Sequence, residues 1–168
     1  MDNGDEMFDV VDAQDHIIGQ ATRREVHQKG WMHRSVHIFV LNPAGDLFLQ
    51  KRAESKDENP GLWDSSTSGH VDAGEDYDTA AHRELQEELG IKSDLKIAFS
   101  LSACPQTFNE HVRVYSCHTD QTIIINRDEI SEGRFWTFEE IEIALQSPSN
   151  QFTSSFVLIW NRFQANTS

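Results

Sequence analysis

The segment from residue 69 to residue 91 constrains the fold of this chain more than any other. It is a loop containing Gly69 and Gly74 that runs into a helix rich in glutamate. A helix advances about 100° and 1.5 Å per residue, so Glu84 and Glu88 lie roughly 6 Å apart, with Glu87 flanking the same side. The sequence therefore predicts three carboxylates that converge on one face of a helix.

The opposite side of this helix is apolar. Ala81, Leu85 and Leu89 recur at helical spacing and can pack on a sheet. Gly90 follows directly and suits the left-handed conformation that ends many helices. We therefore expect a helix that is anchored by one face and presents its carboxylates on the other.

Carboxylates this close repel one another and raise one another's pKa unless a cation lies between them. Oxygen ligands that leave coordination positions for water and phosphate suit Mg²⁺ or Mn²⁺. A solvated acidic surface is the alternative interpretation of Glu-x-x-Glu-Glu alone. The preceding loop favours a metal site, because Gly69 and Gly74 allow the backbone to turn tightly near an anion.

The spacing of characteristic residues extends well beyond the glutamates. Gly69 is followed by Glu75, then by Arg83-Glu84-Leu85, Glu87-Glu88 and Gly90-Ile91. This pattern is the full Nudix box, and the segment resembles the Nudix hydrolase family at every defining position. The resemblance implies an α/β fold, the Nudix α/β/α sandwich with a mixed β-sheet. It also implies a structural pair, Glu75 and Arg83, and Mg²⁺ or Mn²⁺ ligands at Gly69, through its carbonyl, and at Glu84, Glu87 and Glu88.

Length and charge agree with one enzyme domain over residues 1–168. A chain of 168 residues suits a single core. The net charge of −14 argues against a nucleic-acid polymer as partner, because backbone binding needs a basic stripe. Cys104 and Cys117 are too few for a disulfide framework, and no apolar run approaches a membrane span or a secretory signal. We expect a cytoplasmic protein whose polar ends, 1–6 and 164–168, fray.

Apolar periodicity and turn residues predict the other elements. A turn is expected at 42–45, and Thr137 with Glu140 forms a capping box that opens a helix through about Gln146. Strands are predicted at 8–11, 17–18, 35–41, 46–52, 95–103, 112–118, 122–125 and 133–136. A last helix is predicted at about 150–163, where Phe152, Phe156, Trp160 and Phe163 share a face that we interpret as core.

Motifs outside the box indicate a branch of the family. Residues 9–12, 19–23, 33–34, 49–52, 60–63 and 68–70 resemble the branch that includes isopentenyl diphosphate isomerase. That isomerase holds a metal with three histidines and two glutamates. The resemblance places a possible second site for a divalent ion such as Zn²⁺ or Mn²⁺ at His27, His33, His70 and Glu110, with the remaining ligand position at Phe108. Ordinary hydrogen-bonded histidines are the alternative. The other five, His16, His37, His82, His111 and His118, are assigned no role.

The isomerase's catalytic cysteine corresponds to Ser68 in this chain. A hydroxyl is a far poorer acid than a thiol, and protonating an alkene needs a strong, well-placed acid. The three box glutamates, in contrast, suit metal-assisted hydrolysis. The resemblance therefore favours hydrolysis over isomerisation.

Two further roles follow from the hydrolase interpretation. The general base is a box glutamate, which we favour, or a later acid, so Glu87, Glu110 and Glu129 are candidates. Arg23, Lys51 and Arg52 are candidates to hold substrate phosphate, with a solvated basic strand end as the alternative for the last two.

The leading hypothesis is a metal-dependent Nudix pyrophosphohydrolase. Its substrate is a small nucleoside diphosphate derivative or a related organic diphosphate, such as a dinucleotide or a prenyl diphosphate. The alternatives are an isopentenyl diphosphate isomerase-like activity and a non-catalytic module that binds a diphosphate ligand. Many members of the family dimerise, so a homodimer is also possible on the resemblance alone.

Overall fold

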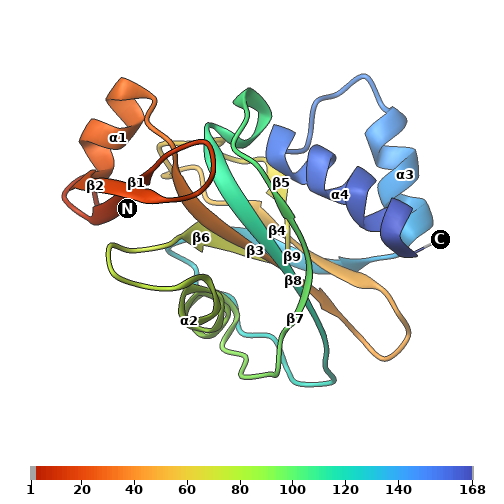
Figure 1. Ribbon diagram of the computed structural model, residues 1–168. Helices are drawn as coiled ribbons and strands as arrows, with labels where there is room; N and C mark the ends of the chain where they lie inside the picture. The colour runs from red at the N-terminus through yellow and green to blue at the C-terminus, as the bar shows by residue number, and fades with distance from the viewer. Residues whose placement is uncertain (1–2, 168) are drawn as a thin grey trace.

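A mixed sheet forms the centre of the molecule in this computed structural model, which describes residues 3–167 (Figure 1). Its central strand β3 (His33–Leu41) pairs in parallel with β8 (Glu110–His118) and antiparallel with β6 (Thr67–His70) and β4 (Leu47–Arg52). The sheet has seven strands, the others being β5 (Trp63–Asp64), β7 (Lys96–Leu101) and β9 (Ile130–Trp136).

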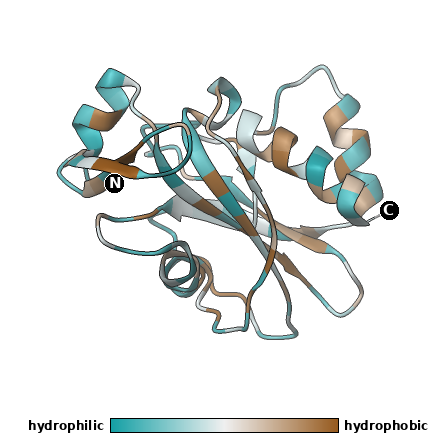
Figure 2. Cartoon of the chain, viewed as in Figure 1, coloured by the Kyte–Doolittle hydropathy of each residue, from teal (hydrophilic) through white to brown (hydrophobic). Residues whose placement is uncertain are grey.

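Helices cover both faces of this sheet. Helix α2 (Tyr77–Leu89) lies on one face, whereas α3 (Phe138–Gln146) and α4 (Ser154–Thr167) lie on the other (Figure 1). Hydrophobic and hydrophilic residues alternate along both the central strands and the helices (Figure 2). The expected α/β/α sandwich with a mixed sheet is confirmed.

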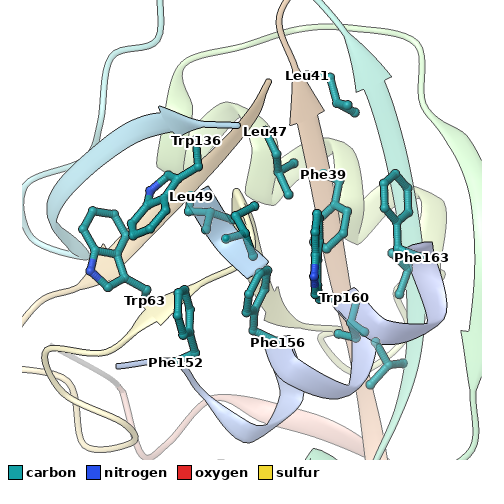
Figure 3. Close-up of a cluster of buried hydrophobic side chains, with 14 of the residues drawn as sticks. Phe39, Leu41, Leu47, Leu49, Trp63, Trp136, Phe152, Phe156, Trp160 and Phe163 are labelled. Atoms are coloured by element: carbon teal, nitrogen blue, oxygen red, sulfur yellow. The ribbon is translucent and has the colours of Figure 1, made fainter. Parts of the chain in front are cut away.

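The two faces of the sheet have separate cores. On the α2 side, Ala81, Leu85 and Leu89 are fully buried, as expected. On the α4 side the predicted aromatic face packs against β3 and β4 and is core (Figure 3). Because successive side chains of a strand point to opposite faces, β3 and β4 feed both cores at once.

Local capping fixes the ends of α2. Asp76 precedes the helix, and its side chain accepts a hydrogen bond from the backbone N–H of Thr79 at 2.7 Å. Gly90 ends it in the left-handed conformation with φ of 66°. The helix is therefore held at both ends as well as by its apolar face.

A small hairpin and a helix precede the sheet. Strands β1 (Met7–Val11) and β2 (Ile17–Thr22) pair antiparallel, and α1 (Arg23–Lys29) follows. Helix α1 was not predicted, although the sequence contains its signals. Thr22 and Glu25 form a capping box, and Gly30 supplies the left-handed C-cap.

Two predicted elements need correction. The strand expected at 122–125 is wrong, because this segment satisfies the last carbonyls of α2 instead of joining the sheet. The N–H of Ile124 donates to the Leu89 carbonyl at 3.0 Å, and the N–H of Asn126 donates to the Glu88 carbonyl at 2.8 Å.

The last helix begins later than predicted, at Ser154 rather than near residue 150. Residues 151–153 are extended against β5, where the Trp63 N–H donates to the Gln151 carbonyl at 2.8 Å and the Thr153 N–H donates to the Trp63 carbonyl at 3.0 Å. The helix continues through Thr167, so residues 164–167 are helical, and residues 1, 2 and 168 lie outside the described part. No helix within residues 3–167 has both the length and the apolar character needed to cross a bilayer.

Candidate active site

The glutamates of α2 differ in their surroundings. Glu88 is buried, and its Oε2 accepts hydrogen bonds from the Gln50 side chain at 2.7 Å and from the Thr67 hydroxyl at 2.6 Å. Glu84 packs directly on Gly69, so that a Cβ at that position would overlap its carboxylate. Glu87 is the exposed member of the set.

Burial and mutual repulsion make it unfavourable for these carboxylates to ionise without a cation. Burial raises the pKa of Glu88 to about 7. Burial and the nearby charge of Glu88 also hold the pKa of Glu84 well above its usual range, although Arg83 opposes this. Carboxylates are hard oxygen donors that suit a divalent ion such as Mg²⁺. Such an ion would compensate the negative charges of Glu84 and Glu88.

Arg83 connects helix α2 to the loop of residues 69–76, which we call the box loop. Its Nε donates to Glu75 Oε1 at 2.8 Å, and its Nη1 donates to Glu84 Oε1 at the same distance. Its Nη2 donates to Glu75 Oε2 at 2.9 Å and to the His70 carbonyl at 3.1 Å. The Glu75–Arg83 pair implied by the resemblance is present, and it positions one of the three glutamates.

The histidines singled out from the sequence come together beside the box loop. The ring centroids of His27, His33 and His70 lie 5.2 to 5.3 Å apart, and their ligand atoms lie within 4.8 Å of one another. Glu110 Oε1 lies 3.0 Å from His70 Nε2 and 3.3 Å from His33 Nε2. Glu58 lies 3.3 Å from His27 Nδ1. These residues could hold a metal ion with imidazole and carboxylate ligands.

The cluster is buried, and its charges interact strongly. Burial opposes ionisation of Glu110, but His70 and His33 hold the pKa of this carboxyl well below its usual range. Burial lowers the pKa of His70, and Glu110 offsets this only in part. For His33, Glu110 and the Trp31 carbonyl outweigh burial and raise the pKa. An ionised Glu110 therefore faces at least one neutral imidazole, a combination that suits metal binding.

Two neighbouring hollows meet at the box loop. The first, which we call the carboxylate cavity, encloses about 800 Å³ including its open part and is lined by Glu84, Glu87, Glu88, Asn126 and Glu129. The second, the polar pocket, encloses about 510 Å³ and is lined by Ser35, His37, Arg52, Asp64, Phe108, Glu110 and Ser155, among others. Both share a rim formed by Arg23, Lys56, Ser68, Gly69 and His70. One ligand can therefore reach both.

The structure places most, but not all, of the expected phosphate-binding cations here. Arg23 lies on the shared rim and Arg52 lines the polar pocket. Lys51 lies opposite Trp63 and Glu132 in the sheet and lines neither hollow. Lys56 lies on the rim, where Lys51 was expected, and forms an ion pair with Glu129. It was missed because it lies in the loop after β4, where no strand periodicity indicates its direction.

The candidate bases lie in different places. Glu87 and Glu129 line the carboxylate cavity, whereas Glu110 lies in the polar pocket with the histidines. His37 also lines that pocket, although no sequence motif assigns it a role. It is buried, with Nδ1 at 2.8 Å from the Ser65 hydroxyl. His37 lies two positions after Ser35 on β3, a spacing that places both side chains on one face of the strand.

A family model described as the NUDIX domain matches residues 31–156. The chain belongs to the Nudix family. The glutamates of the box line the carboxylate cavity. This Nudix protein is a hydrolase that acts on pyrophosphate bonds. Nudix enzymes generally use divalent metal ions.

Similar proteins carry two kinds of name. Isopentenyl-diphosphate Delta-isomerase 2 of Photorhabdus laumondii is 36% identical over 162 residues, covering 94% of this chain and 92% of that protein. An uncharacterized Nudix hydrolase of Pseudomonas aeruginosa is 37% identical over 131 residues, covering 77% of this chain and 78% of that one. A crystal structure from Deinococcus radiodurans superposes with a TM-score of 0.82 at 28% identity, covering 93% of this chain and 98% of that chain. The Nudix protein thus resembles both hydrolases and isomerases.

Gly69→Ala is expected to preserve the fold and to displace Glu84. The added methyl group overlaps the end of a flexible side chain, which can move away without shifting backbone. Metal-dependent turnover should fall roughly 100-fold or more, because catalytic groups misplaced by about 1 Å lose that much. Circular dichroism and turnover measure the two effects, and Gly19→Ala, where a Cβ meets nothing within 4 Å, is the control. Unchanged turnover would contradict the role given to this contact.

Mg²⁺ or Mn²⁺ is expected to stabilise the folded protein against heat. At roughly 100 times the dissociation constant, a ligand that binds only the folded state adds about 2.7 kcal/mol, or roughly 5 to 10 °C in a domain of this size. Differential scanning calorimetry with metal and with chelator measures the shift. Glu88→Gln should lose most of it, and an equal shift in that variant would contradict the ligand assignment.

Proposed function

We propose that this protein hydrolyses a diphosphate linkage in a small nucleoside diphosphate derivative or a related organic diphosphate, using Mg²⁺ or Mn²⁺. The supporting observation is the pair of hollows that share a rim. A cavity of carboxylates adjoins a pocket for an organic group, and Arg23 and Lys56 lie where the two meet. A diphosphate that spans this rim places its phosphates beside both metal ligands and cations.

The roles of the residues follow from their positions. Glu84 and Glu88 would hold the metal, the Gly69 carbonyl would be a further ligand, and Glu87 would contact it through water. When bound, the metal polarises phosphoryl oxygens and lowers the pKa of the attacking water. Arg23, Arg52 and Lys56 neutralise the phosphate charge.

Glu87 is our choice for the general base. It lines the carboxylate cavity and is the most exposed of the three box glutamates, so it can reach a water molecule there. Glu129 lines the same cavity but is paired with Lys56. Glu110 is held between His33 and His70 and faces the polar pocket. Glu87 is therefore the residue best placed to remove a proton from the attacking water.

A specific observation supports a second divalent ion. The ligand atoms of His27, His33 and His70 lie within 4.8 Å of one another, and so do those of Glu58, His70 and Glu110. We propose that this histidine cluster binds Zn²⁺ or Mn²⁺. Metal analysis of the purified protein should show a second equivalent that His33→Ala removes, while Glu88→Gln leaves it in place. Equal content in the two variants would contradict a separate site.

The names of the similar isomerases and the same histidine cluster support isomerase-like activity as the second candidate function. Ser68 weighs against it, because it lies on the shared rim where the resemblance expects a thiol. A non-catalytic ligand-binding role is the third candidate, and the complete carboxylate set weighs against it.

The experiment that tests the proposal is a phosphate-release screen. It compares nucleotide sugars, dinucleotides, nucleoside di- and triphosphates and prenyl diphosphates, each with Mg²⁺, Mn²⁺ or chelator. We expect metal-dependent release from at least one class. Silence across the panel, with binding intact, would favour one of the other two candidates.

A further inference from the structure

The floor of the polar pocket consists of buried polar side chains. Ser35 and His37 come from the same face of β3, and Asp64 comes from β5. Their residues are 3%, 4% and 4% exposed, respectively. The opposite face of β3 at this point carries Val36 and Ile38, which pack with α2. Polar groups are therefore directed into the pocket and apolar groups into the core.

One of these groups lacks a partner inside the protein. The Ser35 hydroxyl is buried and has no hydrogen-bond partner among the described residues. Buried polar groups are nearly always paired, because leaving one unpaired costs free energy. A hydroxyl that lines a pocket in this state indicates a group that a ligand satisfies.

The neighbouring groups are held in fixed positions. His37 Nδ1 is engaged by the Ser65 hydroxyl at 2.8 Å, which leaves Nε2 as the ring nitrogen available to a ligand. Asp64 Oδ1 accepts from the Ser65 N–H at 2.7 Å, and Asp64 Oδ2 lies 3.7 Å from Arg52 Nη1. Burial lowers the pKa of His37, so the imidazole is neutral and Nε2 can donate or accept according to its tautomer.

The pocket lies where the rest of a substrate must go. It shares its rim with the carboxylate cavity, and its volume of about 510 Å³ includes the open mouth. Its buried polar lining suits a polar organic group better than a hydrocarbon. A hydrocarbon in contact with the floor would offer no hydrogen-bond partner to the Ser35 hydroxyl or to His37 Nε2.

We propose that the polar pocket holds the organic group of the substrate and selects a polar group, such as a sugar or a nucleobase, over a hydrocarbon chain. This inference rests on the proposed hydrolase function, because that function places the diphosphate at the shared rim. Ser35 and His37 are the specificity-determining residues. They distinguish this pocket from one suited to a prenyl group.

The first test compares three diphosphates with the unmodified protein and Mg²⁺. Uridine diphosphate offers a base and a sugar, 5-phosphoribosyl 1-diphosphate offers a sugar that carries a 5-phosphate but no base, and isopentenyl diphosphate offers only hydrocarbon. We expect at least one polar compound to exceed isopentenyl diphosphate by about tenfold or more in kcat/KM. The two polar compounds separate sugar recognition from base recognition. Equal or better turnover of isopentenyl diphosphate would overturn the proposal.

The second test changes the floor of the pocket. Ser35→Ala and His37→Leu should raise KM for the better polar compound about tenfold each and leave kcat within about twofold, because they remove ground-state contacts remote from the phosphates. Ser116→Ala, in β8 and outside the pocket lining, is the matched control. A matching fall in kcat with unchanged KM would indicate a structural role only and would count against the proposal.

Binding separates this inference from the hydrolase function itself. Calorimetry with Ca²⁺ in place of Mg²⁺ measures the affinity for the same three compounds without requiring turnover. If no compound releases phosphate, the proposed hydrolysis fails, while tighter binding of a polar compound still supports the pocket assignment. Tighter binding of isopentenyl diphosphate overturns that assignment even if hydrolysis is observed.

Discussion

Glu88→Gln is expected to lower kcat for diphosphate hydrolysis by at least about 1,000-fold, which corresponds to roughly 4 kcal/mol of transition-state stabilisation. The amide carries no charge, so it cannot hold a divalent ion beside the substrate phosphates as a carboxylate does. Steady-state phosphate release at saturating Mg²⁺ measures the loss. Activity within about tenfold of the parent would contradict the assignment of Glu88 as a chief ligand.

The same variant should fold at least as well as the parent in the presence of chelator. Gln50 and Thr67 donate to one oxygen of Glu88, and an amide oxygen accepts the same bonds. Burial makes the ionised carboxylate unfavourable, which is why its pKa is raised to about 7. Chemical denaturation therefore separates lost catalysis from lost folding. Glu139→Gln, on the exposed side of α3, is the control for charge removal alone.

Arg83→Gln is expected to lower both stability and activity. Glu75 and Glu84 lose their guanidinium partner while they remain largely buried, and breaking such a pair costs about 3 kcal/mol. For a domain of this size that is roughly 6 to 12 °C in unfolding temperature. Activity should also fall at temperatures where the variant is folded, because Glu84 loses the hydrogen bond that orients it.

Two matched variants make this prediction sharper. Arg83→Lys keeps the charge but not the planar fork, so its stability should lie between those of Arg83→Gln and the parent. Arg162→Gln removes an exposed arginine from α4 and should change the unfolding temperature by no more than about 1 °C. Full stability and activity in Arg83→Gln would show that the ion pair to Glu75 is dispensable.

Much of the fold could be predicted because its signals are local. The helix over Tyr77–Leu89 combines an apolar face with Gly90 at its end, and the structure confirms both. The helix over Phe138–Gln146 begins at the predicted capping box. Such patterns depend on residues within a few positions of one another, so a single sequence contains them.

The failures arise where distant contacts decide the structure. Residues 122–125 have the apolar composition of a strand, but Ile124 caps α2 instead. Helix α4 starts late because residues 151–153 extend along Trp63, which is about 90 positions earlier in the chain. Neither contact leaves a local pattern in the sequence, so propensity alone predicts the wrong element.

The same division applies to the site. The box glutamates and Arg83 belong to one loop and helix, and their arrangement follows from helical geometry. The polar pocket draws Ser35 and His37 from β3 and Asp64 from β5, so it exists only after the sheet has formed. Lys56 reaches the rim from a loop. Substrate selection is therefore the part that the sequence predicts least well.

The measurement that tests the central claim most directly follows the fate of water during turnover. Isopentenyl diphosphate and uridine diphosphate are each incubated with the protein and Mg²⁺, in water enriched in ¹⁸O and separately in D₂O. Water attack on phosphorus predicts that hydrolysis of uridine diphosphate places one ¹⁸O on phosphorus in one of its two products, visible by ³¹P NMR. It also predicts that isopentenyl diphosphate gains no deuterium at carbon. Deuterium in isopentenyl diphosphate without any release of phosphate from either compound would contradict the account and identify the isomerase chemistry instead.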